Sequence, residues 1–195
     1  MTKAEKTRQF IIEKSAPIFN IKGVAGTAMS DIMEATKLAK GSLYVHFENK
    51  EELAYCAVDY NLKTLLDKIV DAGRSKKTAK ARLLALIGFM GNPLSNPVVG
   101  GCPMLNFGME ADDTNQVILE KVNNAMNTIQ QITTGLVEEG IKNGEFKKSW
   151  NAAEFAVKSF AMIEGSIVIA RLSGKGDKMK MITRILQNEI EEQSN

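Results

Sequence analysis

Residues 24–53, VAGTAMSDIMEATKLAKGSLYVHFENKEEL, constrain the fold more than any other stretch of the chain. Apolar residues recur at helical spacing over about 28–35 and again over about 40–46, and only four residues separate these segments. Two short helices with such a short connection can cross over one small core, for which apolar residues such as Ile32 and Phe47 have the required spacing. The stretch therefore predicts a helix-turn-helix.

Capping signals mark the ends of the neighbouring helices. Thr27 stands just before the first short helix, where its hydroxyl can accept hydrogen bonds from the free amides of the first turn. Asn49 as N-cap and Glu52 three residues later form a box-like start for a long helix over about 50–72. The helix that precedes the motif is expected to end at Gly23.

The second short helix leaves a set of residues outside the shared core: Lys40, Gly41, Ser42, Tyr44, Val45 and His46. Polar side chains in such a set can donate to phosphates and base edges, and a glycine lets the backbone come close to a partner. We expect Lys40 and Ser42 to meet base edges, and Tyr44 and His46 to lie against the DNA backbone. The alternatives are core packing for Tyr44 and an ordinary surface position for His46.

In these residues the chain resembles the tetracycline-repressor (TetR) family of one-component regulators. The resemblance is carried, in order and without gaps, by Gly26-Thr27, Asp31-Ile32, Lys40-Gly41-Ser42-Leu43-Tyr44, His46-Phe47 and Asn49-Lys50-Glu51-Glu52-Leu53. It covers residues of about 8–53, and the remainder is similar to the family only in length and helical character. The resemblance implies two heads that enter successive major grooves of a two-fold symmetric operator, with half-sites about 34–36 Å apart.

Three residues that border the core of the motif are further candidates for contact with DNA phosphates. Lys50 stands at the start of the long helix, and Thr27 at the start of the first short one. Lys37 lies in the turn, where many members of the family carry a glycine. If the backbone there needs positive φ, a lysine costs on the order of 1 kcal/mol, which a phosphate contact could offset.

The charge of the chain is unevenly distributed. Residues 1–50 carry eight Lys and Arg against five Asp and Glu, and the rest carries 17 against 18, so a head of +3 precedes a body of −1. A modestly basic head fits local contact with DNA. Because no apolar run reaches about 18 residues and the N-terminus has no signal-type segment, we expect a cytoplasmic protein without membrane contact.

The chemistry of the side chains argues against a metal centre or an enzyme. Two cysteines 46 positions apart and a single histidine exclude a Cys/His zinc site within one chain, and no cofactor is expected. The sequence also has no catalytic triad, no paired carboxylates at metal spacing and no phosphate-binding loop. A binding protein is therefore expected.

Beyond the head, helical periodicity predicts segments over about 50–72, 78–90, 103–111, 114–143, 151–172 and 178–193, with a breaker-rich loop over 91–101. We therefore expect an all-α chain of about nine helices, with a three-helix helix-turn-helix head in residues 1–48 and a larger effector-binding and dimerisation body in residues 49–195. Two copies of the last two helices can form a four-helix bundle at a homodimer interface. An intrachain core is the alternative.

Apolar side chains of the body are candidates for an effector cavity: Phe89, Met90, Met104, Phe107, Met109, Met126, Phe160 and Met162. Methionine adapts to varied ligands, although at helical spacing it is also an ordinary core residue. Glu110 and Glu164 could orient a polar or cationic ligand, or could face water. The effector is expected to be a small and largely apolar molecule.

Cys102 follows Val-Val-Gly-Gly and precedes a helix, where backbone amides favour a reactive thiol. It could sense oxidants or electrophiles, or it could be a small buried hydrophobic residue. The leading interpretation is a ligand-responsive DNA-binding regulator, a repressor released from its operator by a small molecule. The alternative is a redox-sensing or electrophile-sensing repressor that acts through Cys102.

Overall fold

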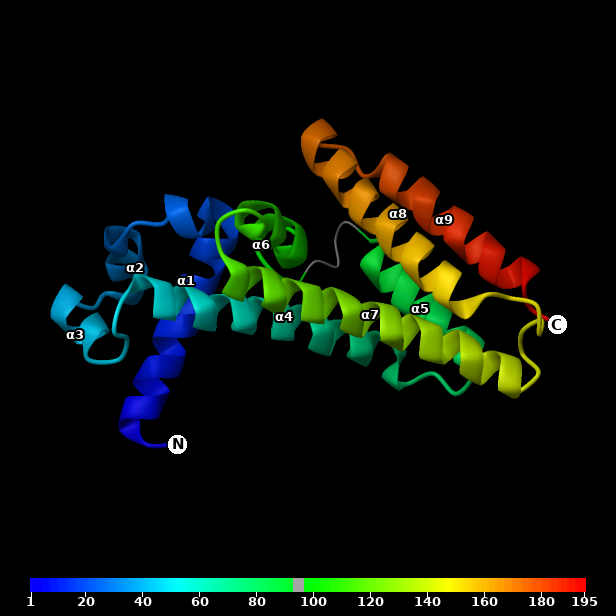
Figure 1. The fold of residues 1–195 in the computed structure, drawn as a ribbon, viewed down its shortest axis with the longest axis horizontal. Coiled ribbons are helices and arrows are strands. Elements are labelled where there is room, and N and C mark those ends of the chain that lie inside the picture. Colours follow the sequence, from blue (N-terminus) through cyan, green and yellow to red (C-terminus); the bar gives the residue numbers. More distant parts are fainter. Residues whose placement is uncertain (93–96) are drawn as a thin grey trace. The chain divides into compact units, whose positions relative to one another are not determined.

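The computed structural model describes residues 1–92 and 97–195, and these residues form nine helices (Figure 1). The helices are α1 (Lys3–Gly26), α2 (Met29–Thr36), α3 (Lys40–Tyr44), α4 (Lys50–Arg74), α5 (Ala79–Met90), α6 (Pro103–Ala111), α7 (Gln116–Lys142), α8 (Ala152–Ser173) and α9 (Asp177–Glu192). The prediction of an all-α chain with about nine helices is confirmed. Of the loop predicted over 91–101, residues 93–96 lie outside the described residues. Each helix in the described part of the chain is too short or too polar to span a lipid bilayer.

The contacts divide the chain into two compact units. Unit one comprises residues Met1–Leu65 and Val98–Ala125, and unit two comprises Leu66–Pro97 and Met126–Asn195. Unit one therefore contains α1 to α3, most of α4, all of α6 and the first turns of α7. The division predicted from the sequence follows the end of the helix-turn-helix motif, at residue 48, and stays a prediction.

The core of unit one forms where α1 packs against α2 and α6. Its fully buried large side chains come from six helices: Ile11, Phe19, Ile32, Leu43, Leu53, Phe107 and Ile118. A polar link also joins α4 to α1, because the buried Asn61 amide donates to the carbonyl oxygen of Ala16 at 2.9 Å. The helix-turn-helix and α6 therefore share one core.

The connection between α1 and α2 differs from the prediction. Gly23 has φ 76° and ψ 169°, so the helix breaks there, as expected, but one more turn follows before α2 begins. The Thr27 hydroxyl donates to the Gly23 carbonyl at 2.6 Å and does not cap α2. Instead, the Asp31 carboxylate accepts from the N–H of Ala28 at 3.0 Å. The prediction of Thr27 as the N-cap is wrong, because the extra turn directs its hydroxyl back toward α1.

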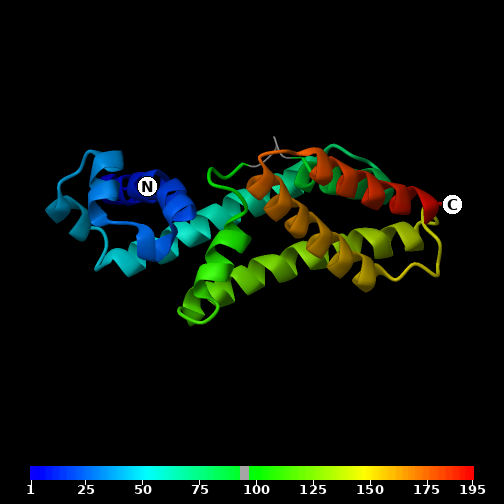
Figure 2. The same cartoon turned by 90° about the horizontal axis from the view of Figure 1, so that it is seen from above.

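In unit two, α8 and α9 lie side by side, and α5 packs against α9 (Figures 1 and 2). An aromatic cluster holds the connection from α7 to α8. Trp150 contacts both Phe146 and Phe155, with ring centroids 4.9 and 4.7 Å apart. The Phe146 ring lies against Gly140 near the end of α7. The aromatic rings thus fix how the chain turns from one long helix into the next.

Glu145 attaches the same connection to α5. Its carboxylate accepts hydrogen bonds from the N–H groups of Ala79 at 3.1 Å and Lys80 at 2.9 Å, which are free amides at the start of that helix. Burial is the largest single effect and raises the pKa of Glu145. The hydrogen bonds from the Lys80 and Ala79 amides and from the Asn143 and Thr78 side chains together outweigh it, so the pKa lies below its ordinary value. Glu145 therefore acts as a cap for a helix distant in sequence.

Two glycines of α7 should respond in opposite ways to an added methyl group. A Cβ at Gly140 would lie 2.2 Å from the Phe146 ring, whereas a Cβ at Gly135 would meet nothing within 4 Å. We expect Gly140→Ala to lower the free energy of unfolding by about 1–3 kcal/mol, because the ring must move. Gly135→Ala should raise it by about 0.5–1 kcal/mol, since alanine favours the helix. Urea unfolding followed by circular dichroism measures both, and equal effects would contradict the described packing.

Candidate nucleic-acid interface

The outer surface of α3 is formed by the residues that the sequence selects for DNA contact. Lys40, Gly41 and Ser42 are exposed, and Tyr44 is 41% exposed. A Cβ added to Gly41 would meet nothing within 4 Å, so the backbone is open to a partner there. The Lys40 ammonium lies 5.9 Å from the centre of the Tyr44 ring. Because Tyr44 is exposed, the alternative that it packs in the core is wrong.

The inner surface of the same motif is apolar and closed. Ile32, Leu43 and Phe47 are 0%, 1% and 3% exposed, so the spacing read from the sequence identifies the shared core correctly. His46 is half-buried at the edge of this core. The short helix α3 therefore has one face fixed by burial and another face free to meet DNA.

Lys37 occupies the turn between α2 and α3 in a left-handed conformation. Its φ is 57° and its ψ is 25°. Among the described residues other than glycine, Lys37 alone has a positive φ. The backbone of this turn therefore has the positive φ that the sequence analysis considered. The side chain is exposed. Its contact with a phosphate stays a prediction.

Thr27 and Lys50 already have partners inside unit one. The Thr27 side chain is buried, with 1% exposed, and bonds to Gly23 as described above. The Lys50 ammonium donates to the carbonyl oxygens of Val24 at 2.9 Å and Thr27 at 3.1 Å. Their contacts with DNA phosphates stay predictions. In this structure the Thr27 hydroxyl and the Lys50 ammonium form hydrogen bonds to backbone carbonyls within unit one.

A cluster around Arg8 supports the motif and was not found from the sequence. The Arg8 guanidinium pairs with the Glu52 carboxylate at 2.6 Å and lies 4.4 Å from the centre of the Phe47 ring. Its two terminal nitrogens also lie 3.5 Å from the sulfur of the half-buried Cys56. No periodic signal links residues 44 positions apart, so only the folded chain shows that α1 is tied to the start of α4 in this way.

The predicted cap of α4 is confirmed. The Asn49 side chain accepts from the N–H of Glu52 at 2.8 Å, and the Glu52 carboxylate accepts from the N–H of Glu48 at 2.6 Å. The hydrogen bond from Glu48, and then the one from Arg8, lower the pKa of the Glu52 carboxyl against the opposing effect of burial. Glu52 is therefore held as an anion at the positive end of α4.

The effector candidates are divided between the two units. Met104 and Phe107 are buried in unit one, whereas Phe89, Met90, Met126, Phe160 and Met162 are half-buried residues of unit two. Met109 is 71% exposed, so its assignment to an interior cavity is wrong. Of the two carboxylates, Glu110 is half-buried and accepts hydrogen bonds from backbone amides of unit one, and Glu164 is buried.

Cys102 is buried at the start of α6, with 4% of its surface exposed. Pro103 follows at the first helical position, as the sequence predicts. A thiol that solvent does not reach reacts slowly with dissolved oxidants. The position therefore fits a small buried residue better than a redox sensor.

Comparison with known proteins agrees with this geometry. The family model "Bacterial regulatory proteins, tetR family" matches residues 11–54, and the model "Tetracyclin repressor-like, C-terminal domain" matches residues 79–186, which is more than half of the chain. The chain belongs to the TetR family of transcriptional regulators. The first model ends at the start of α4, so it covers the candidate interface in full.

Some of the similar proteins match most of the chain and others match a shorter part of it. The HTH-type transcriptional regulator TtgR of Pseudomonas putida is 28% identical over 169 residues, 84% of this chain and 80% of TtgR. The probable acrEF/envCD operon repressor of Escherichia coli K12 is 46% identical over 54 residues, 27% of this chain and 24% of that repressor. A crystal structure of a TetR-family regulator from Cytophaga hutchinsonii is 36% identical, covers 100% of this chain and 98% of its own, and has a TM-score of 0.92.

Replacement of Lys37 separates the strain of this turn from its charge. We expect Lys37→Gly to raise the free energy of unfolding by about 1 kcal/mol, because glycine adopts positive φ without a steric penalty. Lys37→Ala removes the same charge but keeps a Cβ, so it should bring no such gain. Urea unfolding of both variants tests this expectation, and equal stability of the two would contradict the strained turn.

Proposed function

We propose that this TetR-family regulator is a homodimeric repressor whose two α3 helices enter successive major grooves of an operator. The observation that carries the proposal is the open surface of Lys40, Gly41, Ser42 and Tyr44 on a helix whose opposite face is buried. A short helix of this kind can present donors to base edges while its core holds it in place. The basic head adds attraction to phosphates.

We further propose that a small, largely apolar effector releases the repressor from its operator. Met104 and Phe107 are buried apolar side chains of unit one, and the aromatic and methionine candidates of unit two are half-buried. Each set by itself supports an apolar ligand of this kind. α4 is one continuous helix from Lys50 to Arg74 and contributes to both units, so a change in its direction would alter the spacing of two heads. By linkage, operator and effector must weaken each other's binding by the same factor.

The proposed dimer forms through α8 and α9. These helices expose a set of large apolar side chains that a second copy could cover: Val157, Val168, Ile169, Leu172, Met181 and Ile185. Within unit two the pair already packs side by side, so two copies would make a four-helix bundle. The buried position of Cys102 does not favour the thiol-based alternative.

Operator recognition can be tested with a duplex selected by the wild-type protein from a random-sequence library. We expect the selected sequence to be two-fold symmetric with half-sites about one helical turn apart. Lys40→Ala should weaken binding to it by about 1–3 kcal/mol, measured by fluorescence anisotropy at fixed salt. Lys148→Ala, which removes an exposed lysine of unit two, is the control and should change little. Selection of no common sequence would refute the proposal.

Dimerisation can be tested with a charge on the exposed face of α9. Ile185 is 45% exposed, and Ile185→Asp would place a carboxylate in the proposed interface. We expect the dimer dissociation constant to rise by about 100-fold or more, because an uncompensated buried charge costs roughly 3 kcal/mol. Val70→Asp on α4, at 49% exposed, is the matched control and should leave the dimer intact. Sedimentation velocity measures both, and a wild-type monomer or an unaffected Ile185→Asp dimer would exclude this interface.

A further inference from the structure

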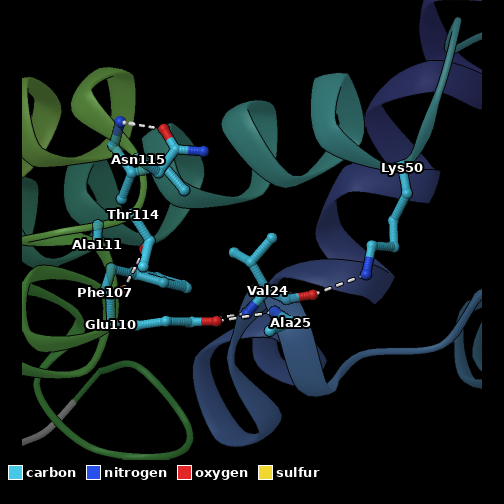
Figure 3. A pocket seen from close by; sticks show the side chains of 9 residues that line it. Val24, Ala25, Lys50, Phe107, Glu110, Ala111, Thr114 and Asn115 are labelled. Carbon is cyan, nitrogen blue, oxygen red and sulfur yellow. Dashed lines mark hydrogen bonds between the residues drawn. The ribbon is translucent and has the colours of Figure 1, made fainter.

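The backbone of residues Val24, Ala25, Gly26 and Thr27, here called the 24–27 turn, sets the direction of the chain from α1 into α2. Because Gly23 interrupts the helix, the first N–H groups after it have no acceptor within α1. The carboxylate of Glu110 on α6 accepts both of them, from Val24 at 2.8 Å and from Ala25 at 2.7 Å (Figure 3). One side chain thus satisfies two adjacent backbone donors.

The other end of the 24–27 turn is held by a cation. The Lys50 ammonium at the start of α4 donates to the carbonyl oxygen of Val24 (Figure 3). It also donates to the carbonyl oxygen of Thr27. A carboxylate at the amide end and an ammonium at the carbonyl end match the dipole of a helical turn. Because α2 follows at once, a shift of this turn would redirect α2 and with it α3.

A second set of hydrogen bonds joins α6 and the segment before it to α1. The buried Asn20 amide donates to the carbonyl oxygens of Val99 at 2.8 Å and Gly101 at 3.0 Å. The Asn106 amide donates to the backbone carbonyl of Asn20 at 2.9 Å and to that of Gly100 at 3.0 Å. The segment before α6 and the middle of α6 are therefore bonded to α1 through Asn20 and Asn106, and the end of α6 is bonded to α1 through Glu110.

Gly23 and Glu110 fit each other closely. A Cβ at position 23 would lie 2.7 Å from Oε2 of Glu110, and the φ of 76° also favours glycine. A cavity of about 160 Å³ adjoins this contact, lined by Phe107, Ile118 and Lys50 among others (Figure 3). The Glu110 carboxylate thus has the cavity on one side and the backbone of Gly23 on the other. Its position therefore depends on the hydrogen bonds that it accepts from Val24 and Ala25.

We propose that Glu110 is a positioning residue for DNA binding: it holds the 24–27 turn so that α2 and α3 stand in the orientation that reads the operator. The proposal rests on the proposed function, since it assigns to Glu110 a role in operator recognition. Glu110 touches no DNA in this role and acts through the backbone of Val24 and Ala25. Specific binding needs the correct orientation of α3, whereas non-specific attraction to phosphates depends mainly on charge.

The test compares Glu110→Gln with the wild type and with Glu120→Gln, a control at an exposed glutamate of α7 that accepts a hydrogen bond from the nearby Gln116 side chain. A glutamine offers one acceptor oxygen, so one of the two amides loses its partner. We expect affinity for the selected duplex to fall about tenfold, the change that one lost charge-assisted hydrogen bond produces. Affinity for a scrambled duplex of equal length should change less than about twofold. In Glu110→Gln alone, hydrogen exchange of the Val24 and Ala25 amides should accelerate, measured by NMR without DNA.

A second variant guards against a simple loss of folding. Gly23→Ala should also lower operator affinity, and it should do so less in a Glu110→Ala background, where the Cβ has no carboxylate to displace. Operator affinity of Glu110→Gln that matches the control overturns the proposal. A parallel fall in operator and non-specific binding, in step with lost folded protein, also overturns it. A wild-type protein that does not discriminate between the duplexes refutes the proposed function, and the exchange rates then still report whether Glu110 holds the turn.

Discussion

The fold of unit one depends on the hydrogen bonds that other helices make to the backbone of the 24–27 turn. A helix break within a compact unit leaves amides and carbonyls that must be satisfied. Here the acceptor is Glu110 on α6 and the donor is Lys50 on α4, so three helices meet at four residues of backbone. The apolar core holds these helices together without fixing their directions, because burial is not directional. The charged contacts supply the direction.

The difference between local patterns and contacts distant in sequence explains how much of the fold could be predicted from the sequence. Helices follow from local periodicity, and the α4 cap from Asn49 and Glu52 involves residues three positions apart, so both were predicted correctly. The bond between Val24 and Glu110 joins residues 86 positions apart, and the pair of Arg8 and Glu52 joins residues 44 apart. No local pattern encodes such pairs. Thr27 was misassigned for the same reason, since its role depends on the conformation of Gly23.

The candidate site shows the difference between selecting residues and assigning their contacts. The open face of α3 was predicted from the sequence because burial of Leu43 and Phe47 determines which side chains remain outside. Lys50 belongs to the same motif, yet its ammonium lies against two carbonyl oxygens of the α1–α2 connection. A residue of the motif can thus have a structural role, and its predicted contact with a phosphate does not follow from its place in the motif alone.

The attachment of α6 to α1 also has a consequence for chimeric regulators. A head grafted onto a foreign body at the end of the helix-turn-helix motif would lose the carboxylate of Glu110 and the amide of Asn106, because both come from residues far beyond the junction. Such a graft would need an acidic side chain at the matching place on the recipient's sixth helix. Cutting the chain according to compact units, with α6 travelling together with the head, preserves these bonds.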